Sequence, residues 1–186
     1  MSAHPDYLPF PNLGAKNVVQ ERFELPVLDR LLGLPRDARI LEVGCGRGVA
    51  LASLSERCRP TALVGLDVDP TLLAEAAKRL QARGASAVLY EGDVRRMPFD
   101  DASFDVVMDF GTAYHVARPE RALAEIERVL RVGGLFVYES PVSQLVAHPI
   151  RGNVRRLPWR AAPALAPHRR AVLWSSRAKQ PVARRP

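Results

Sequence analysis

The middle of the chain alternates short apolar runs with stretches whose apolar residues recur at helical spacing. Short β-branched runs bounded by Gly, Pro or Asp are typical of buried strands, whereas apolar residues three and four positions apart are typical of helices. We expect strands at Arg39–Val43, Ala62–Asp67, Ala87–Glu91, Phe104–Asp109 and Leu135–Glu139, and helices at Gly48–Arg57, Pro70–Arg83 and Pro119–Arg131. Repeated strand-helix-strand units predict an α/β fold, with a mostly parallel sheet and helices on both faces.

Two of these helices have a clear apolar face for the sheet. The helix from Pro70 presents Leu72, Leu73, Ala76, Ala77 and Leu80. The helix from Pro119 presents Ala122, Leu123, Ile126, Val129 and Leu130, and we expect Gly133-Gly134 to stop it before the next strand.

The two ends of the chain have weaker patterns. Val18–Leu32 predicts an amphipathic helix that stops at Gly33, behind an irregular Pro-rich segment at residues 5–11, and it is interpreted equally as a lid or as cover for the sheet. After Glu139 prolines interrupt the pattern, and Ala171–Ser176 alone resembles a further strand. We expect one domain over residues 1–186, with an N-terminal segment at 1–37, a core at 38–140 and a basic Pro-rich region at 141–186.

Charge is distributed unevenly along the chain. The formal net charge is +7, but ten Lys and Arg and no Asp or Glu follow Glu139, so the remainder carries 17 basic and 20 acidic groups, or −3. A basic stretch suits phosphates or an anionic membrane surface. However, Arg outnumbers Lys 24 to 3 along the whole chain, and the stretch lacks interleaved aromatics, so the composition does not favour nucleic acid.

The cellular compartment is suggested by the cysteines and the apolar runs. Cys45 and Cys58 are the only cysteines and form neither a disulfide framework nor a metal-ligand cluster. The N-terminus lacks a basic start followed by an apolar stretch, and no apolar run reaches roughly 18 residues. We expect a cytoplasmic protein without a membrane span or a bound metal.

A glycine-rich loop follows the first predicted strand. Gly44, Gly46 and Gly48 stand between that strand and a helix, where missing side chains allow a sharp turn and close approach to a ligand. The dinucleotide fingerprint would require glycine at position 49, where this chain has Val49. The loop therefore predicts a ligand site and argues against a nicotinamide cofactor.

Three carboxylates lie near the carboxyl ends of the predicted strands. Glu42 lies within the first, Asp67 ends the second, and Asp93 follows the third in Glu91-Gly92-Asp93-Val94. Asp67 is placed to accept hydrogen bonds from both hydroxyls of a ribose. Asp69 precedes Pro70 and is better explained as a helix N-cap.

This ordered set over approximately residues 38–140 resembles the class I S-adenosylmethionine-dependent methyltransferases, whose first motif is similar to Glu42-x-Gly44-x-Gly46-x-Gly48. The resemblance implies a three-layer Rossmann-like sandwich and S-adenosyl-L-methionine as cofactor. It assigns Asp67 to the ribose and Asp93, beside the apolar Val94, to the adenine amine, although an Asx-type turn also explains Asp93. The cofactor-binding residues that it implies are Glu42, Gly44, Cys45, Gly46, Gly48, Asp67, Val68, Asp93, Val94, Asp109 and Phe110.

The acceptor side is expected after the fourth strand, in Asp109-Phe110-Gly111-Thr112-Ala113-Tyr114-His115. Tyr114 and His115 are the candidate catalytic residues. Imidazole, with an unperturbed pKa of about 6.5, can remove a proton from an acceptor near neutrality, but the same side chain can also cap local backbone. The Asn/Asp-Pro-Pro-Tyr/Phe segment of nucleic-acid amino methyltransferases is missing, so we expect a small-molecule acceptor, lipid-like ones included.

Two other functions are consistent with parts of the sequence. A non-catalytic module could keep the cofactor pocket and act through its basic C-terminal region on nucleic acid, a protein or a membrane. A nicotinamide oxidoreductase is disfavoured by Val49.

Overall fold

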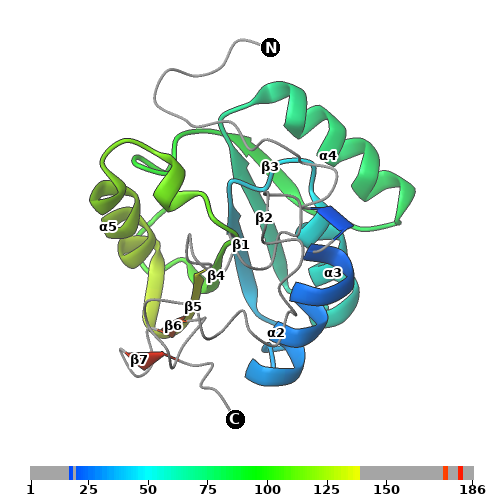
Figure 1. The fold of residues 1–186 in the computed structure, drawn as a ribbon, viewed down its shortest axis with the longest axis horizontal. Coiled ribbons are helices and arrows are strands. Elements are labelled where there is room, and N and C mark those ends of the chain that lie inside the picture. Colours follow the sequence, from blue (N-terminus) through cyan, green and yellow to red (C-terminus); the bar gives the residue numbers. More distant parts are fainter. Residues whose placement is uncertain (1–16, 19, 139–173, 176–179, 182–186) are drawn as a thin grey trace, which may run out of the picture.

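The computed structural model describes residues 17–18, 20–138, 174–175 and 180–181. Its centre is a sheet of five strands in the order β3-β2-β1-β4-β5, all of them parallel (Figure 1). The strands are β1 (Arg39–Val43), β2 (Ala62–Asp67), β3 (Val88–Glu91), β4 (Phe104–Asp109) and β5 (Leu130–Tyr138). The predicted strands are confirmed, three of them with their predicted bounds.

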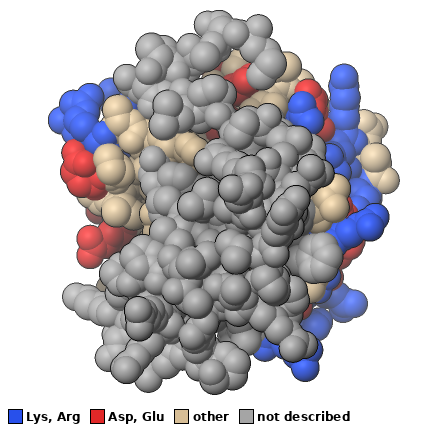
Figure 2. All heavy atoms as spheres, viewed as in Figure 1, with Lys and Arg blue, Asp and Glu red and all other residues tan. Residues whose placement is uncertain are grey.

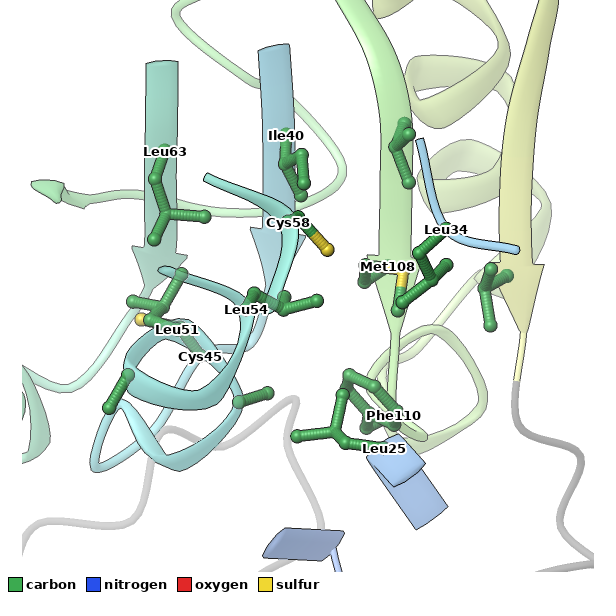
Figure 3. Close-up of a cluster of buried hydrophobic side chains, with 14 of the residues drawn as sticks. Leu25, Leu34, Ile40, Cys45, Leu51, Leu54, Cys58, Leu63, Met108 and Phe110 are labelled. Atoms are coloured by element: carbon green, nitrogen blue, oxygen red, sulfur yellow. The ribbon is translucent and has the colours of Figure 1, made fainter. Parts of the chain in front are cut away.

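Helices cover both faces of this sheet (Figure 1). They are the π-helical turn η1 (Gln20–Glu24), α2 (Leu25–Leu32), α3 (Val49–Cys58), α4 (Pro70–Ala82), the 3₁₀ turn η2 (Ala113–His115) and α5 (Pro119–Val129). On one face α2, α3 and α4 pack against β1, β2 and β4; Figure 3 shows side chains of α3 lying over the sheet and Leu25 beside Phe110. On the other face α5 packs against the same strands, which confirms the predicted three-layer α/β sandwich.

Burial of both sheet faces follows from the strand sequences. Neighbouring residues of a strand point to opposite faces, and Ile40 and Leu41 are 1% and 0% exposed in the two different core clusters. The adjacent apolar residues of β1 therefore pack against the helices on both faces of the sheet.

The transition from α5 to β5 differs from the prediction. The helix ends at Val129, the strand begins at Leu130, and Gly133-Gly134 lie inside β5 rather than before it. Phe104 pairs with Leu130 and Val106 with Leu135, so β5 bulges between these pairs. Gly133, at φ +75°, adopts the left-handed backbone within this bulge, so this glycine serves the strand and not the end of the helix.

The N-terminal segment is helical in two parts. The predicted helix over Val18–Leu32 includes the π-helical turn η1 before α2, and Gly33 ends α2 with left-handed backbone as expected. Leu25 and Leu28 of α2 are 0% and 5% exposed in the core. Of the two predicted roles, α2 thus has that of covering the sheet; residues 5–11 lie outside the described part.

The apolar faces of α4 and α5 are narrower than predicted. In α4 Leu73, Ala76 and Leu80 are buried, whereas Ala77 is exposed. In α5 Leu123 is 42% exposed. Asp69 caps α4 as predicted, since its Oδ1 accepts from the Thr71 amide at 2.8 Å and the Leu72 amide at 3.4 Å.

Only fragments of the C-terminal region are described. Trp174–Ser175 (β6), within the predicted strand Ala171–Ser176, pairs antiparallel with Gln180–Pro181 (β7) in a ladder separate from the main sheet. Residues 139–173 and most of the basic region lie outside the description. Among the helices that are described, none has the length and apolar character needed to cross a membrane.

Candidate functional site

The site lies at the carboxyl edge of the sheet, where the chain leaves β1, β2 and β4. Val43 is in register with Leu66 of β2 on one side and with Asp109 of β4 on the other. The strand order reverses between β1 and β4, which is where open α/β sheets bind their ligands.

The three glycines after β1 have left-handed backbone but different surroundings. Their φ angles are +65° at Gly44, +51° at Gly46 and +68° at Gly48. A Cβ on Gly44 would lie 1.8 Å from Thr112 Oγ1, and one on Gly48 would lie 2.9 Å from the Cβ of Ala76. A Cβ on Gly46 would meet nothing within 4 Å. The outer two glycines thus permit close packing, while the middle one faces open space.

Helix α4 braces this loop. Arg79 Nε donates to the carbonyl of Arg47 at 3.0 Å, and Arg47 Nε lies 2.7 Å from Glu75 Oε2. Arg47, the basic residue of the loop, is therefore paired on the helix side.

Asp67 is tied to the glycine loop at the end of β2. Its Oδ2 accepts from the Gly46 amide at 2.7 Å and its Oδ1 from the Asp69 amide at 3.0 Å. Burial raises the pKa of this carboxyl, and the two amide bonds oppose that rise. Each oxygen has a further lone pair, so hydroxyl donors can add to this arrangement.

Two carboxylates act on the buried start of the loop. Burial raises the pKa of the Cys45 thiol, and the charges of Glu42 and Asp67 raise it further, so both carboxylates act at the loop. Glu42 itself is only 2% exposed. Carboxylates at this place can compensate positive charge on a ligand, such as a sulfonium or an α-amino group.

The loop after β4 is held by Asp109. This carboxylate is fully buried and accepts from the amides of Gly111 at 2.9 Å, of Thr112, and of Ala113 at 3.1 Å. Thr112 Oγ1 then donates to the carbonyl of Val43 at 3.1 Å. Asp109 thus shapes the turn, and Thr112 fastens it to the end of β1.

The candidate catalytic residues follow directly. Tyr114 and His115 lie in η2, and the His115 amide donates to the Thr112 carbonyl at 2.9 Å. Both ring nitrogens of His115 are buried.

Asp93, the predicted adenine ligand, is engaged by Arg95. The Arg95 amide donates to Oδ1 at 2.8 Å, and its guanidinium reaches both carboxylate oxygens, the shortest contact being Nη2 to Oδ2 at 2.6 Å. Arg95 Nη1 also donates to the carbonyl of Ala117 at 3.3 Å. The predicted Asx-type turn is therefore present.

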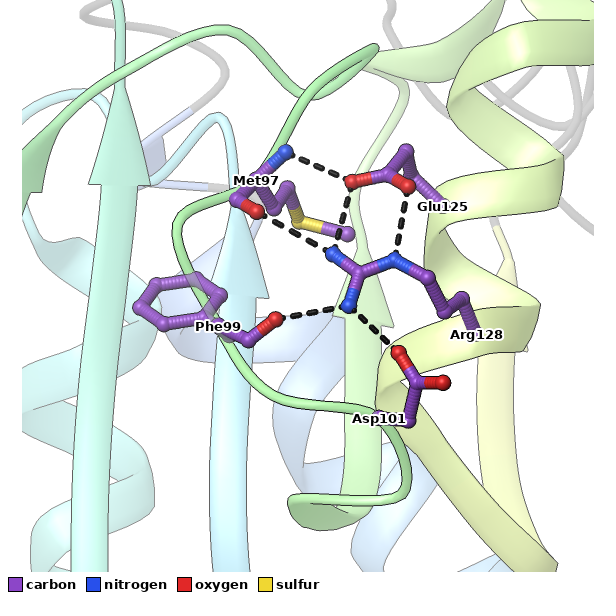
Figure 4. A network of polar contacts seen from close by, with 5 residues as sticks. All are labelled: Met97, Phe99, Asp101, Glu125 and Arg128. Carbon is purple, nitrogen blue, oxygen red and sulfur yellow. Dashed lines mark hydrogen bonds and ion pairs between the residues drawn. The ribbon is translucent and has the colours of Figure 1, made fainter.

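A second arginine fastens the segment after Asp93 to α5 (Figure 4). Glu125 Oε2 accepts from the Met97 amide at 2.7 Å. Arg128 donates to the carbonyls of Phe99 at 2.7 Å and Met97 at 3.1 Å and pairs with Glu125 and Asp101. The Arg128 bond lowers the pKa of Glu125.

Residues 41–138 match the model of a family described as a methyltransferase domain. The chain belongs to the class I methyltransferases. Membership confirms the predicted resemblance and with it the cofactor of the family, S-adenosylmethionine. It favours an enzyme over a non-catalytic module or an oxidoreductase.

The names of two relatives of this methyltransferase domain specify lipid substrates. The phthiotriol/phenolphthiotriol dimycocerosates methyltransferase of Mycobacterium leprae is 40% identical over 100 residues, 54% of this chain and 36% of that protein. The fatty-acid O-methyltransferase of Mycolicibacterium smegmatis is 36% identical over the same shares. The chain thus aligns with little more than a third of these curated relatives. A crystal structure of an S-adenosylmethionine-dependent methyltransferase of Aquifex aeolicus, 21% identical, covers 66% of this chain and 65% of its own with a TM-score of 0.58, which supports the fold.

The structure gathers the predicted cofactor residues at one edge but in unequal positions. Gly46, Asp67 and Val68 are partly exposed, whereas Cys45 and Phe110 are 4% exposed and belong to the core. For these two residues, backbone is what the site can use. The sequence interpretation missed Thr112 and Arg95, because neither belongs to a periodic pattern.

The described charged side chains on the face shown in Figure 2 lie along its two flanks. Acidic and basic side chains adjoin one another on the left flank, and basic side chains predominate on the right.

Proposed function

We propose that this methyltransferase domain transfers a methyl group from S-adenosylmethionine to a small-molecule acceptor. The observation that carries the proposal is the open space at Gly46, whose amide donates to the Asp67 carboxylate at 2.7 Å. When bound, the cofactor would supply a methyl group on a positively charged sulfur. The bond between sulfur and methyl would break as the acceptor nucleophile, attacking in line, forms its bond to the methyl carbon, and the acceptor's proton would go to a base or to water.

The residues of the loop would share the binding. Gly46 leaves room for close approach, Asp67 accepts from the ribose hydroxyls, and the buried Val94 contributes an apolar wall for the base. Glu42 compensates positive charge on the amino-acid part of the cofactor. Neighbouring Gly44, Cys45, Gly48 and Val68 contribute backbone and shape.

The segment Asp109–His115 would receive the acceptor. Asp109 fixes the turn through three backbone amides, and Tyr114 and His115 follow in η2. We propose His115 as the base that takes the acceptor's proton, with Tyr114 beside it along the chain. The alternative role of His115 is to stabilise the turn η2, of which it is the last residue.

The acceptor class is proposed as apolar or lipid-like. The support is the similarity to two mycobacterial methyltransferases whose names specify a dimycocerosate lipid and a fatty acid.

Localisation in the cytoplasm stays a prediction, and the buried free thiols of Cys45 and Cys58 are compatible with it.

Calorimetry with S-adenosylhomocysteine tests the donor side. We expect the folded chain to bind S-adenosylhomocysteine. Asp67→Ala should weaken binding at least about tenfold, because the ligand loses its hydrogen bonds to a charged group. Asp100→Ala, an exposed carboxylate in the 97–101 segment, is the matched control. Absence of binding to well-folded wild-type protein would refute the proposal. A screen of fatty acids and hydroxylated lipids for transfer of labelled methyl then identifies the acceptor.

A further inference from the structure

We infer that Arg95 makes this pocket tolerant of the substituent at position 6 of the purine. The inference rests on the proposed function and concerns the specificity of its adenine end. Asp93 is expected to accept a hydrogen bond from the adenine amine, but in the structure its carboxylate already binds Arg95.

Asp93 is placed beside the proposed ribose site. The Gly92 amide donates to the carbonyl of Asp67 at 2.9 Å, and a Cβ on Gly92 would lie 2.9 Å from Leu66 Cδ1. The chain then turns back, with Asp93 and Arg96 forming an antiparallel bridge. Adenine is attached to the ribose. If the ribose binds Asp67, we therefore expect the adenine to extend toward the turn that contains Asp93.

Arg95 engages both oxygens of Asp93. Oδ1 accepts from the Arg95 amide at 2.8 Å and from Nε at 3.0 Å, while Oδ2 accepts from Nε at 3.0 Å and Nη2 at 2.6 Å. A carboxylate offers about four lone-pair sites, so these donors use most of its capacity. Charge-assisted bidentate pairs of this kind are among the stronger hydrogen bonds.

The guanidinium is also held from its other side. Nη1 donates to the carbonyl of Ala117 at 3.3 Å, and the Arg95 side chain is only 10% exposed. Displacing it would break the bidentate pair with Asp93 and the bond to Ala117 together, and the arginine side chain is itself nearly buried, so this costs more than moving a surface arginine. We therefore expect the Asp93–Arg95 pair to persist when a nucleoside binds.

This pair changes which purines the pocket distinguishes. A free carboxylate accepts from the 6-amino group of adenine and repels the 6-oxo group of hypoxanthine, so it discriminates strongly. A carboxylate neutralised by Arg95 has little capacity left for the amine. The neighbouring guanidinium, a donor only, can donate to N1 of adenine or to O6 of hypoxanthine.

Calorimetry with S-adenosylhomocysteine and its 6-oxo analogue, S-inosylhomocysteine, tests the inference without an activity assay. For the wild-type chain we expect the two dissociation constants to agree within about tenfold, a difference of one modest hydrogen bond. Arg95→Met, which keeps an unbranched stem and removes the guanidinium, should raise the preference for the adenine ligand to about 100-fold or more, because Asp93 is freed. Thermal melts establish that each variant is folded.

Arg96→Ala is the matched control. It removes an exposed arginine from the same turn, and with it one positive charge, as the Arg95 variants do. It should leave the ratio of dissociation constants unchanged. Arg95→Gln provides a second removal of charge that retains hydrogen bonding, and it should give the same direction as Arg95→Met if the latter does not fold.

The outcomes separate the two claims. A wild-type preference of more than about tenfold for the adenine ligand overturns the role of Arg95, and so does an unchanged ratio in the folded Arg95 variants. Absence of S-adenosylhomocysteine binding by the folded wild-type chain overturns the proposed function, and this inference with it.

Discussion

Thr112 occupies the space that a side chain on Gly44 would need. The missing Cβ would lie 1.8 Å from Thr112 Oγ1, which donates to the Val43 carbonyl at 3.1 Å. The first glycine of the loop therefore lets the turn after β4 close against the end of β1. Val43 and Thr112 are 69 residues apart in sequence, so their hydrogen bond joins two distant segments at the carboxyl edge of the sheet.

Substituting Gly44 and Gly46 by alanine should separate packing from ligand binding. Both residues have positive φ, so each variant carries a backbone cost of roughly 1–2 kcal/mol. Gly44→Ala adds the clash with Thr112 and should be clearly less stable in chemical denaturation than Gly46→Ala. Gly46→Ala should instead weaken S-adenosylhomocysteine binding, because its methyl group fills the open space.

The double variant Gly44→Ala/Thr112→Gly isolates the contact between these residues. Removing the Thr112 side chain relieves the clash, so the double variant should lose less stability than the sum of the losses in Gly44→Ala and Thr112→Gly. Equal stability of Gly44→Ala and Gly46→Ala, or purely additive effects in the double variant, would contradict the packing that the structure shows.

Cofactor affinity should fall in acid through protonation of Asp67. Burial raises the pKa of this carboxyl above its ordinary 3.8, and hydrogen bonds from ribose hydroxyls favour the ionised form. Binding should therefore strengthen as pH rises through the raised pKa and weaken as pH falls through it. Calorimetry of S-adenosylhomocysteine binding from neutrality into the acid range measures this. Asp67→Asn should bind weakly and lose the dependence; a wild-type affinity independent of pH over that range would argue against ribose contact by Asp67.

Arg128→Ala should destabilise the fold by about 2 kcal/mol, because it leaves the Met97 and Phe99 carbonyls and the Glu125 carboxylate without a charged donor. Chemical denaturation measures the loss. Arg121→Ala removes an exposed arginine from the same helix and should change stability by less than about 0.5 kcal/mol. Equal effects of the two variants would show that the network in Figure 4 is not a significant source of stability.

The same network has a defined dependence on pH. The pKa of Glu125 is lowered from 4.5 by its bond to Arg128, so its contribution is fully present above 4.5 and is lost as pH falls through the lowered value. The stability difference between wild type and Glu125→Gln should accordingly be constant near neutrality and shrink only in stronger acid.

His115→Gln should lower kcat by about 100-fold if the imidazole takes the acceptor's proton, the lower end of what general bases contribute. S-adenosylhomocysteine affinity should stay near that of wild type, since His115 lies in η2 beyond the proposed cofactor loop. Both quantities are measured with the acceptor found in the lipid screen. An unchanged kcat would assign His115 to the turn that it ends.

Several features of this protein could be predicted from the sequence because their signals are local. Each buried strand is a short, mainly apolar segment, and β1, β2 and β4 have the predicted bounds. Asp69 before Pro70 identified a helix start, and the spacing of Gly44, Gly46 and Gly48 identified the loop. The family follows from the order of these segments along the chain.

The remaining features depend on which segments meet in space. A glycine pair after a helix is typical of a helix stop, yet Gly133 lies in a bulge of β5 because the register with β4 requires extra residues there. Asp93 has the expected place in the sequence, but its partner is decided by an arginine that also reaches the loop after β4. Local composition therefore determined the elements and the cofactor loop, while tertiary contacts over long sequence separations decided what each side chain binds, because such contacts leave no periodic trace in the sequence.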